Sequence, residues 1–421
     1  MIRLASLTVL TVMLLGQARA HPLRLDGELR MAADGDGVAQ TYALLRPELR
    51  EELSAWLSFR AGVRIEAAGS RTGLGRLDGF ADAEQPLEIG DDARLELDHV
   101  TLEADLGHSR LTLGKQTVAW GVLDGVRITD GFNPQRLTEW VAREPRPDRI
   151  PVWAARLRGE VGRLSYDFAA APFGSVTQVA APGDAFEPVA PRFRGGYEVG
   201  VTATNPERDV PGGFGESPRL GARIGTSFGR TDAHLVALSG PDLEGVVRFN
   251  GTGLEVAHDR TTMLGVDLVR PAGAAVLRFE AAYVFDQPVN LRPASLPMDD
   301  ETGRLTVGAG ADWYAFGETY FNAQVIIDQL TSDVDAVRPD RDVVTTLRVR
   351  RDLGTDRWTL MAESLHTHGT GDGVLRTELT RQLGGPWTAT LGGDLFYGPR
   401  QGLFGQFGDA SRVTLSIGFA L

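Results

Sequence analysis

Apolar and polar residues alternate along much of the chain, and the alternation is most regular at the C-terminal end. Within 411–421, Val413, Leu415, Ile417 and Phe419 fall on one face of a strand, and polar or small residues fall on the other. A tilted strand of this length is long enough to cross a bilayer. The ending of the chain therefore predicts a membrane-spanning β-strand.

Segments with the same period of two recur throughout the chain and are separated by turn residues. In each, large apolar side chains form one face and charged or amide side chains form the other. The clearest examples are 53–66, 277–286, 321–328, 343–350 and 387–397. We interpret the apolar faces as lipid-facing and the polar faces as directed into an interior.

The connections between these segments alternate between short and long. The short ones are centred on 50–52, 107–109, 162–163, 229–231, 270–273, 316–317, 354–356 and 384–386, and the long ones on 67–92, 120–150, 172–217, 239–251, 286–303, 329–341 and 398–410. This layout predicts an all-β fold, a transmembrane antiparallel up-and-down β-barrel with short periplasmic turns and long extracellular loops. The count gives 18 strands, with 16 as the alternative.

Two details of the strand pattern need interpretation. We take the segment 252–270 as one long strand, because splitting it would place the polar segment 286–303 in the periplasm. The phase of the alternation changes near His99, from Leu95 and Leu97 to Val100. This change predicts a β-bulge or a bend.

The N-terminus is typical of a secretion signal. Arg3 is followed by an apolar run from Leu4 to Leu15, too short for a membrane helix, and then by Ala18-Arg19-Ala20. We expect residues 1–20 to be a signal peptide and 21–421 to be the barrel, located in the cell outer membrane. The chain has no Cys and a net charge of −13. The acidic balance makes nucleic acid an unsuitable partner, and no cofactor is expected.

The polar faces carry many charges, which would be very costly to bury unpaired in a dry core. A water-filled lumen or a network of ion pairs removes that cost, and either selection of solutes or bracing of the wall fits the pattern. The residues predicted to line a pore are Arg60, Arg64, Arg156, Arg158, Arg223, Arg278, Glu280, Arg348, Arg350, Arg376, Glu378 and Arg412.

The segment 120–150 is the densest group of aromatic, charged and Pro residues. We expect a packed loop that folds inward and constricts the pore, with a rigid extracellular cap as the alternative and a short helix from Gln135 to Val141. Its candidate residues are Trp120, Asp124, Asp130, Asn133, Glu139, Trp140, Arg143 and Arg146. The Pro-rich segment 172–217 is long enough to form a lid.

This part of the chain resembles a known family. Gly114-Lys115-Gln116, Trp120-Gly121, the run Asp130-Gly131-Phe132-Asn133-Pro134, and Pro151-Val152 are similar to motifs of uncharacterised porin-like β-barrels of the Gram-negative outer membrane. That family is distantly similar to alginate-export-type barrels. Some members are encoded beside exporters of lipids or hydrophobic compounds, so the resemblance implies an inner-membrane exporter system as a partner.

Catalytic and metal-binding patterns are weak by comparison. His108-Ser109 lies in a predicted turn, His366 and His368 share a strand face, and acidic clusters occur at 299–301 and 333–342. We expect no enzyme activity and no metal site, and interpret the acidic clusters as solvated loops rather than Ca²⁺ sites.

The predicted function is therefore a porin-like outer-membrane channel for small solutes or a lipid-like cargo, in contact with outer-membrane lipid and lipopolysaccharide. The alternative is a plugged barrel that acts as a receptor, adhesin or outer-membrane enzyme through its extracellular loops.

Overall fold

The computed structural model describes residues 23–35, 37–69, 74–139, 149–196, 206–292, 297–354 and 357–421. The predicted signal peptide lies outside these ranges, as do Trp140, Arg143 and Arg146.

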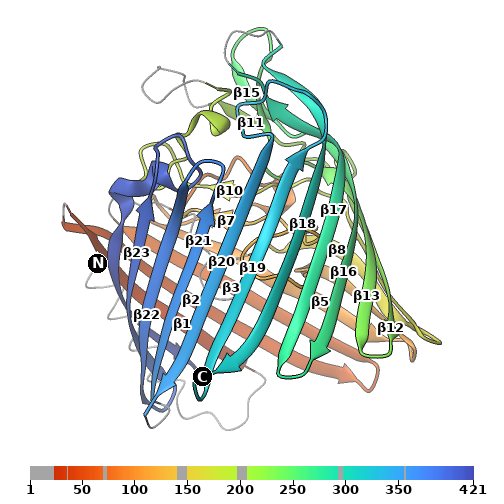
Figure 1. Cartoon of the computed structure of the whole chain (residues 1–421). Coiled ribbons are helices and arrows are strands. Elements are labelled where there is room, and N and C mark those ends of the chain that lie inside the picture. Colours follow the sequence, from red (N-terminus) through yellow and green to blue (C-terminus); the bar gives the residue numbers. More distant parts are fainter. Residues whose placement is uncertain are drawn as a thin grey trace.

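Antiparallel strands form one closed sheet (Figure 1). Eighteen strands of the described residues follow one another around it, and the first, β1, also pairs with the last, β24. They are β1 (Leu23–Asp34), β2 (Gly37–Ser54), β3 (Leu57–Gly69), β5 (Ala93–Asp105), β6 (Ser109–Gln116), β8 (Val152–Val161), β9 (Leu164–Ala171), β12 (Arg219–Phe228), β13 (Thr231–Pro241), β16 (Arg260–Ala272), β17 (Ala275–Asn290), β18 (Asp299–Ala315), β19 (Thr319–Leu330), β20 (Arg341–Leu353), β21 (Trp358–Thr367), β22 (Asp372–Gly384), β23 (Trp387–Tyr397) and β24 (Arg412–Ala420). The prediction of an 18-stranded barrel is confirmed, and the 16-stranded alternative is wrong.

The remaining elements lie in the long connections. They are β4 (Leu87–Glu88), which flanks β5, the pair β7 (Arg136–Leu137) and β10 (Gln178–Val179), the small sheet of β11 (Glu207–Asp209), β14 (Val246–Phe249) and β15 (Leu254–Ala257), and the 3-10 helices η1 (Asp82–Glu84), η2 (Pro191–Phe193) and η3 (Gly405–Ala410). The small sheet stands above one rim of the barrel (Figure 1). No helix within the described ranges is long and apolar enough to span a membrane.

The strand faces divide as the alternation predicts. On β24, Val413, Leu415 and Ile417 are 58%, 54% and 44% exposed, whereas Arg412 is 6% exposed. Large apolar side chains are exposed in the same way on strands around the whole barrel. A soluble protein does not expose so many, so the outer face is the lipid-facing band of a transmembrane barrel.

The bulge near His99 is confirmed. Gly62 of β3 pairs with His99, whereas the next residue, Val63, pairs with Leu97, so Asp98 is the extra residue of β5. The bulge restores the apolar residues of both halves of β5 to the outer face.

Two strand boundaries were predicted wrongly. The segment 252–270 is not one strand, because β15 pairs with β14 above the rim and only β16, starting at Arg260, belongs to the barrel. The first short turn lies at 55–56 rather than 50–52. The charged residues 50–52 are exposed and continue the ladder of β2, which shows that this strand extends beyond the apolar band.

Candidate functional site

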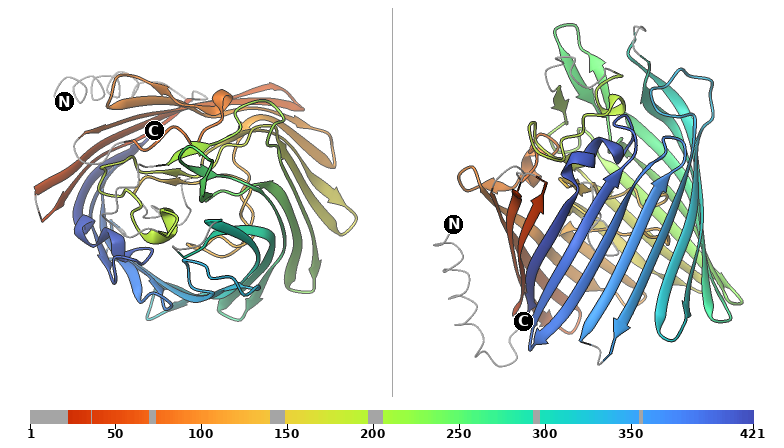
Figure 2. Two further views of the ribbon diagram at one scale, coloured as in Figure 1. Left: turned by 90° about the horizontal axis from the view of Figure 1, so that it is seen from above. Right: turned by 60° about the vertical axis from the view of Figure 1, so that its left-hand side comes forward.

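The connection between β6 and β8 enters the barrel, and seen from above it lies inside the ring of strands (Figure 2). We call its residues 117–139 the inward loop. Trp120 and Phe132 are 3% and 0% exposed and pack against small and apolar side chains of the barrel wall. These wall residues come from six strands and include Ala154, Ala169, Val236, Leu238, Met263, Ala282 and Ile326. The apolar contact fixes one side of the loop to the wall.

A buried carboxylate holds the same side of the loop. Glu280, on β17, accepts hydrogen bonds from the backbone N–H groups of Val122, Leu123 and Thr129, and from the Thr129 hydroxyl. The Leu123 and Thr129 backbone bonds measure 2.6 and 3.0 Å. Its neighbour Arg278 donates to the carbonyl oxygen of Val122 over 2.7 Å. The loop backbone thus has its polar groups satisfied by the wall.

Two polar residues of the loop fix its internal shape. Asn133 is fully buried; its Oδ1 accepts from the Val118 backbone N–H over 2.6 Å, and its Nδ2 donates to the carbonyl oxygen of Ile150 over 2.8 Å. Asp130 accepts from the Trp120 backbone N–H over 3.2 Å and from the guanidinium of Arg149 over 2.9 Å. These bonds explain why Asp and Asn occur in the motif at 130–134.

The far end of the loop reaches another part of the wall. Glu139 forms ion pairs of 2.6 Å with Arg30 of β1 and with Arg412 of β24, and accepts from Gln40 of β2 over 2.9 Å. Burial would raise the pKa of Glu139, but Arg30 and Arg412 outweigh it and lower this pKa to about 2. The loop therefore crosses the lumen from β17 to β24 and is ion-paired at its end.

The low pKa of Glu139 leads to a pH prediction. A group whose pKa is lower in the folded state stabilises that state above its unfolded pKa of about 4.3, and the contribution is lost as the pH falls toward 2. We expect the wild-type loop to resist proteolysis down to about pH 4, whereas Glu139→Gln should be cleaved within 117–139 at neutral pH. Limited proteolysis with mass spectrometry measures this, and equal resistance in both proteins would contradict it.

The loop also joins an ion network on β3 and β5. Arg136 lies 2.6 Å from Glu96 and 3.9 Å from Glu66, and Arg64 lies 2.8 Å from Glu66. The predicted short helix from Gln135 to Val141 is wrong over the described residues, because 136–137 form β7, which pairs in parallel with β10 of the 172–217 connection. The extended backbone brings Arg136 to the wall.

The other predicted pore residues form ion pairs along the wall. Arg158 and Arg110 both pair with Glu103. Arg350 is mostly exposed and lies 4.0 Å from Asp352. Glu378 is half-buried on β22. Asp124 lies 3.5 Å from Asn322. The remaining pairs are Arg60–Glu48, Arg156–Asp167, Arg223–Asp267, Arg278–Asp312, Arg348–Glu363, Arg376–Asp394 and Arg412–Asp394. Most join residues on neighbouring strands, so they brace the wall whether or not they also contact a solute.

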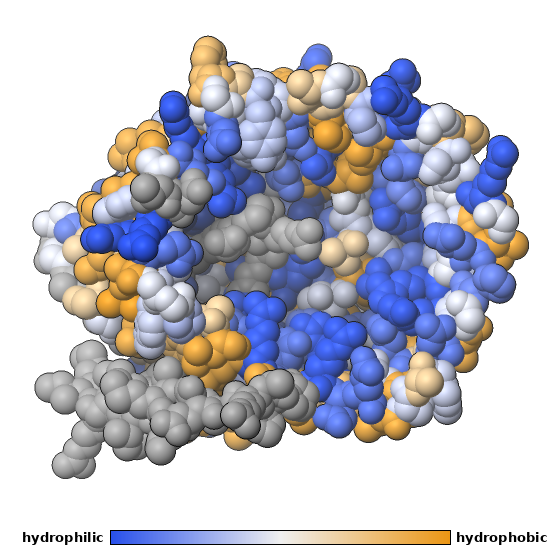
Figure 3. Space-filling model, turned by 90° about the horizontal axis from the view of Figure 1, so that it is seen from below, coloured by the Kyte–Doolittle hydropathy of each residue, from blue (hydrophilic) through white to orange (hydrophobic). Residues whose placement is uncertain are grey.

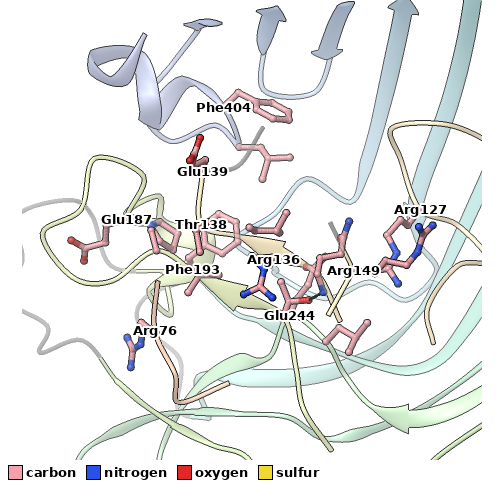
Figure 4. Close-up of a pocket in the computed structure, with 18 of the residues that line it drawn as sticks. Arg76, Arg127, Arg136, Thr138, Glu139, Arg149, Glu187, Phe193, Glu244 and Phe404 are labelled. Atoms are coloured by element: carbon pink, nitrogen blue, oxygen red, sulfur yellow. Dashed lines mark hydrogen bonds between the residues drawn. The ribbon is translucent and has the colours of Figure 1, made fainter. Parts of the chain in front are cut away.

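A cavity of about 800 Å³ lies beside the inward loop (Figure 4). Its lining comes from the wall, the inward loop and the other long connections, and includes Arg76, Arg136, Glu139, Arg192 and Phe404. Twelve arginines and nine acidic residues line it, which gives a modest excess of positive charge. Seen from below, hydrophilic residues surround a central hollow (Figure 3).

A second cavity of about 330 Å³ is more strongly basic, and we call it the basic alcove. Its charged lining consists of Glu103, His99 and five arginines, namely Arg50, Arg60, Arg110, Arg156 and Arg158. Apart from Thr117, its lining residues come from β2, β3, β5, β6 and β8, which are consecutive strands of the wall. Such an excess of guanidinium groups favours anions.

Sequence reasoning missed several members of these groups. Arg30 lies in phase with the polar face of β1, so the alternation contained a signal for it. Arg127 and Arg149 lie in irregular segments without that period. The Glu139–Arg412 pair joins residues that are 273 positions apart in the sequence, and no local pattern indicates it.

The histidines considered for a metal site lie on the outer face. The rings of His366 and His368 are 4.6 Å apart, and His366 Nδ1 lies 3.2 Å from the Tyr397 hydroxyl. Over the residues with described positions, no three His, Cys, Asp or Glu side chains are grouped to hold a metal ion.

Among the comparisons with known proteins, the likeness to OccAB1 supports the fold. No family model and no curated protein matches the chain. The solved structure of OccAB1 from Acinetobacter baumannii gives a TM-score of 0.52 at 9% identity, covering 95% of each chain. A BenF-like porin from Pseudomonas fluorescens Pf-5 gives 0.48 at 12% identity, covering 95% of this chain and 97% of its own. Wzi from Escherichia coli, a carbohydrate-binding outer-membrane barrel, gives 0.48 at 10%, covering 99% and 87%.

The class of the protein follows from the closed sheet and its lipid-facing band. It is an outer-membrane β-barrel with a porin-like fold, and its place is the outer membrane. The finer similarity to alginate-export-type barrels stays a prediction from the motifs at 114–134.

Proposed function

We propose that the protein is a narrow, water-filled channel for small solutes, constricted by the inward loop. The observation that supports this most is the 800 Å³ cavity beside a loop that contacts the wall at β17 and at β24. A loop fastened at two places narrows the lumen without depending on a ligand to hold it. In this proposal the connection 172–217 extends the constriction through the β7–β10 pair.

The charges of the lining favour small anions. Five arginines and one carboxylate line the basic alcove, and arginines also outnumber acidic residues in the larger cavity. Two of the five, Arg60 and Arg156, are ion-paired with carboxylates outside the alcove lining. In a confined space with low-dielectric walls, such an excess concentrates counter-ions of the opposite sign. The overall negative charge of the chain does not oppose a preference for anions, because the passage of an ion depends on the charges along its path.

The proposal extends to orientation and partners. The rim that carries the long connections and the small sheet faces outward, where it contacts lipopolysaccharide, and the opposite rim, with its short turns, faces the periplasm. An inner-membrane exporter system as a partner, and a lipid-like cargo, rest on the family resemblance alone.

Planar bilayers test the channel directly. We expect purified, folded protein to produce discrete current steps in KCl that are smaller than those of an unobstructed barrel of the same strand number. Folding is checked by the heat-dependent shift in electrophoretic mobility. Folded protein that produces no steps would favour the alternative of a plugged barrel.

A further inference from the structure

One part of the membrane-embedded wall is built from a loop. β6 pairs with β5 only over Val100–Asp105 and ends at Gln116, whereas β5 continues upward to Ala93. Beside this upper part of β5 lies β4, which belongs to the connection between β3 and β5. We call residues 82–88 the wall panel, because they occupy the place above the end of β6.

The panel lies within the lipid-facing band. Leu45, Ile65, Leu95 and Leu87 form one continuous row of register partners across β2, β3, β5 and β4. All four are apolar, and Leu87 is 64% exposed. Leu87 therefore takes the position that a residue of a longer β6 would have occupied.

Few bonds hold the panel to its surroundings. Two register pairs and the ion pair of 3.1 Å between Glu88 and Arg94 join it to β5. On its other side the Trp153 backbone N–H donates to Glu84 Oε1 over 2.7 Å, the Trp153 indole N–H donates to the carbonyl oxygen of Ala83 over 3.0 Å, and Lys115 Nζ donates to the carbonyl oxygen of Glu84 over 3.3 Å. By contrast, β6 and β8 share eight register pairs over their length.

Behind the panel, a series of buried ion pairs leads from the wall to the lumen. Lys115 lies 3.7 Å from Glu96, and Glu96 lies 2.6 Å from Arg136. Arg136 lines the 800 Å³ cavity. Displacement of the panel would therefore connect the lumen sideways to the hydrocarbon region.

We propose that the wall panel is a lateral door through which apolar solutes pass between the lumen and the bilayer. The inference rests on the proposed channel function and adds a second exit to it. Apolar solutes are the class that uses it, because only they gain free energy by moving from an aqueous lumen into hydrocarbon. Ions and polar solutes stay on the axial path, since leaving water for hydrocarbon is costly for them.

A disulfide that locks the panel tests the proposal, and the chain has no native Cys to interfere. Leu87→Cys with Leu95→Cys places thiols on register partners of β4 and β5. The matched control, Leu360→Cys with Leu379→Cys, places them on register partners of β21 and β22. The probe is 1-N-phenylnaphthylamine, whose fluorescence rises when it enters the outer membrane of cells that produce the protein.

We expect the oxidised panel lock to reduce probe uptake to the level of cells without the protein, and a reductant to restore it, while the control lock changes nothing. Single-channel current should be the same in both locked proteins. Uptake that is unaffected by the panel lock, or current that disappears together with uptake, would overturn the lateral door. Absence of current from the unlocked protein would instead refute the channel.

A second variant keeps the test valid if the lock does not fold. Trp153→Phe removes the indole bond to Ala83 and keeps an aromatic side chain. We expect about a fivefold rise in probe uptake, the factor that corresponds to the loss of one hydrogen bond. Unchanged uptake from well-folded Trp153→Phe protein would count against the door.

Discussion

Replacing Glu280 with glutamine should release the inward loop and raise the single-channel conductance several-fold. One carboxylate accepts three backbone N–H groups and a hydroxyl, and it is 1% exposed. Glutamine has only one acceptor oxygen, and its NH₂ group would face N–H and O–H groups of the loop that are themselves donors. Hydrogen bonds to a charged group contribute roughly 1.5–3 kcal/mol each, and the donors left behind are buried. We therefore expect the loop to detach at this side, with a lower thermal unfolding temperature.

The matched control is Glu363→Gln, which removes a carboxylate of the barrel wall that lines the cavity and does not hold the inward loop. Glu363 pairs with Arg348 over 2.6 Å, a bond between neighbouring wall strands. Its replacement should leave the conductance within about a factor of two, because bracing pairs are partly redundant around a closed barrel. Equal conductance of Glu280→Gln and wild-type protein, with the loop still protected from proteolysis, would show that Glu280 does not hold the constriction.

The barrel could be predicted well from the sequence because the pattern that forms each strand is local and is repeated along the chain. Each strand needs only an apolar face toward lipid and a turn at each end, and both occur at fixed short spacing. The rule failed where the environment changes within a segment. In 252–270 the part around 254–257 leaves the barrel for the small sheet above the rim, and alternation alone does not distinguish the two sheets.

The site was predicted in part, for a different reason. The density of Trp, Asp and Asn residues indicated a packed loop, and the structure brings Trp120, Asp130 and Asn133 together. The partners of the loop could not be predicted, since Glu280, Arg30 and Arg412 lie on strands that are far away in sequence. The number of strands and their tilt determine which strands face each other across a lumen. The period-two pattern of the sequence does not give either quantity accurately enough.

Reversing charge in the basic alcove should reverse the ion preference of the channel. Arg110 and Arg158 share Glu103 at 3.3 and 3.2 Å, and their side chains are 45% and 42% exposed. Such exposed pairs contribute about 1 kcal/mol or less to stability, so Arg110→Glu with Arg158→Glu should fold. The change replaces two positive charges with two negative ones beside Glu103, and the local field then favours cations.

The measurement is the reversal potential across a KCl gradient. Wild-type protein should prefer Cl⁻, Arg158→Glu should reduce that preference, and the double variant should prefer K⁺. Arg400→Glu is the matched control, because Arg400 is exposed in a long connection and pairs there with Asp409. Charge reversal at Arg348 and at Arg350 distinguishes bracing of the wall from selection of ions. Arg348 is 12% exposed and ion-paired, so its reversal should destabilise the wall. Arg350 is 59% exposed, so its reversal tests ion selection. If the double variant and Arg400→Glu shift the reversal potential equally, the alcove does not lie on the ion path, and its arginines only brace the barrel.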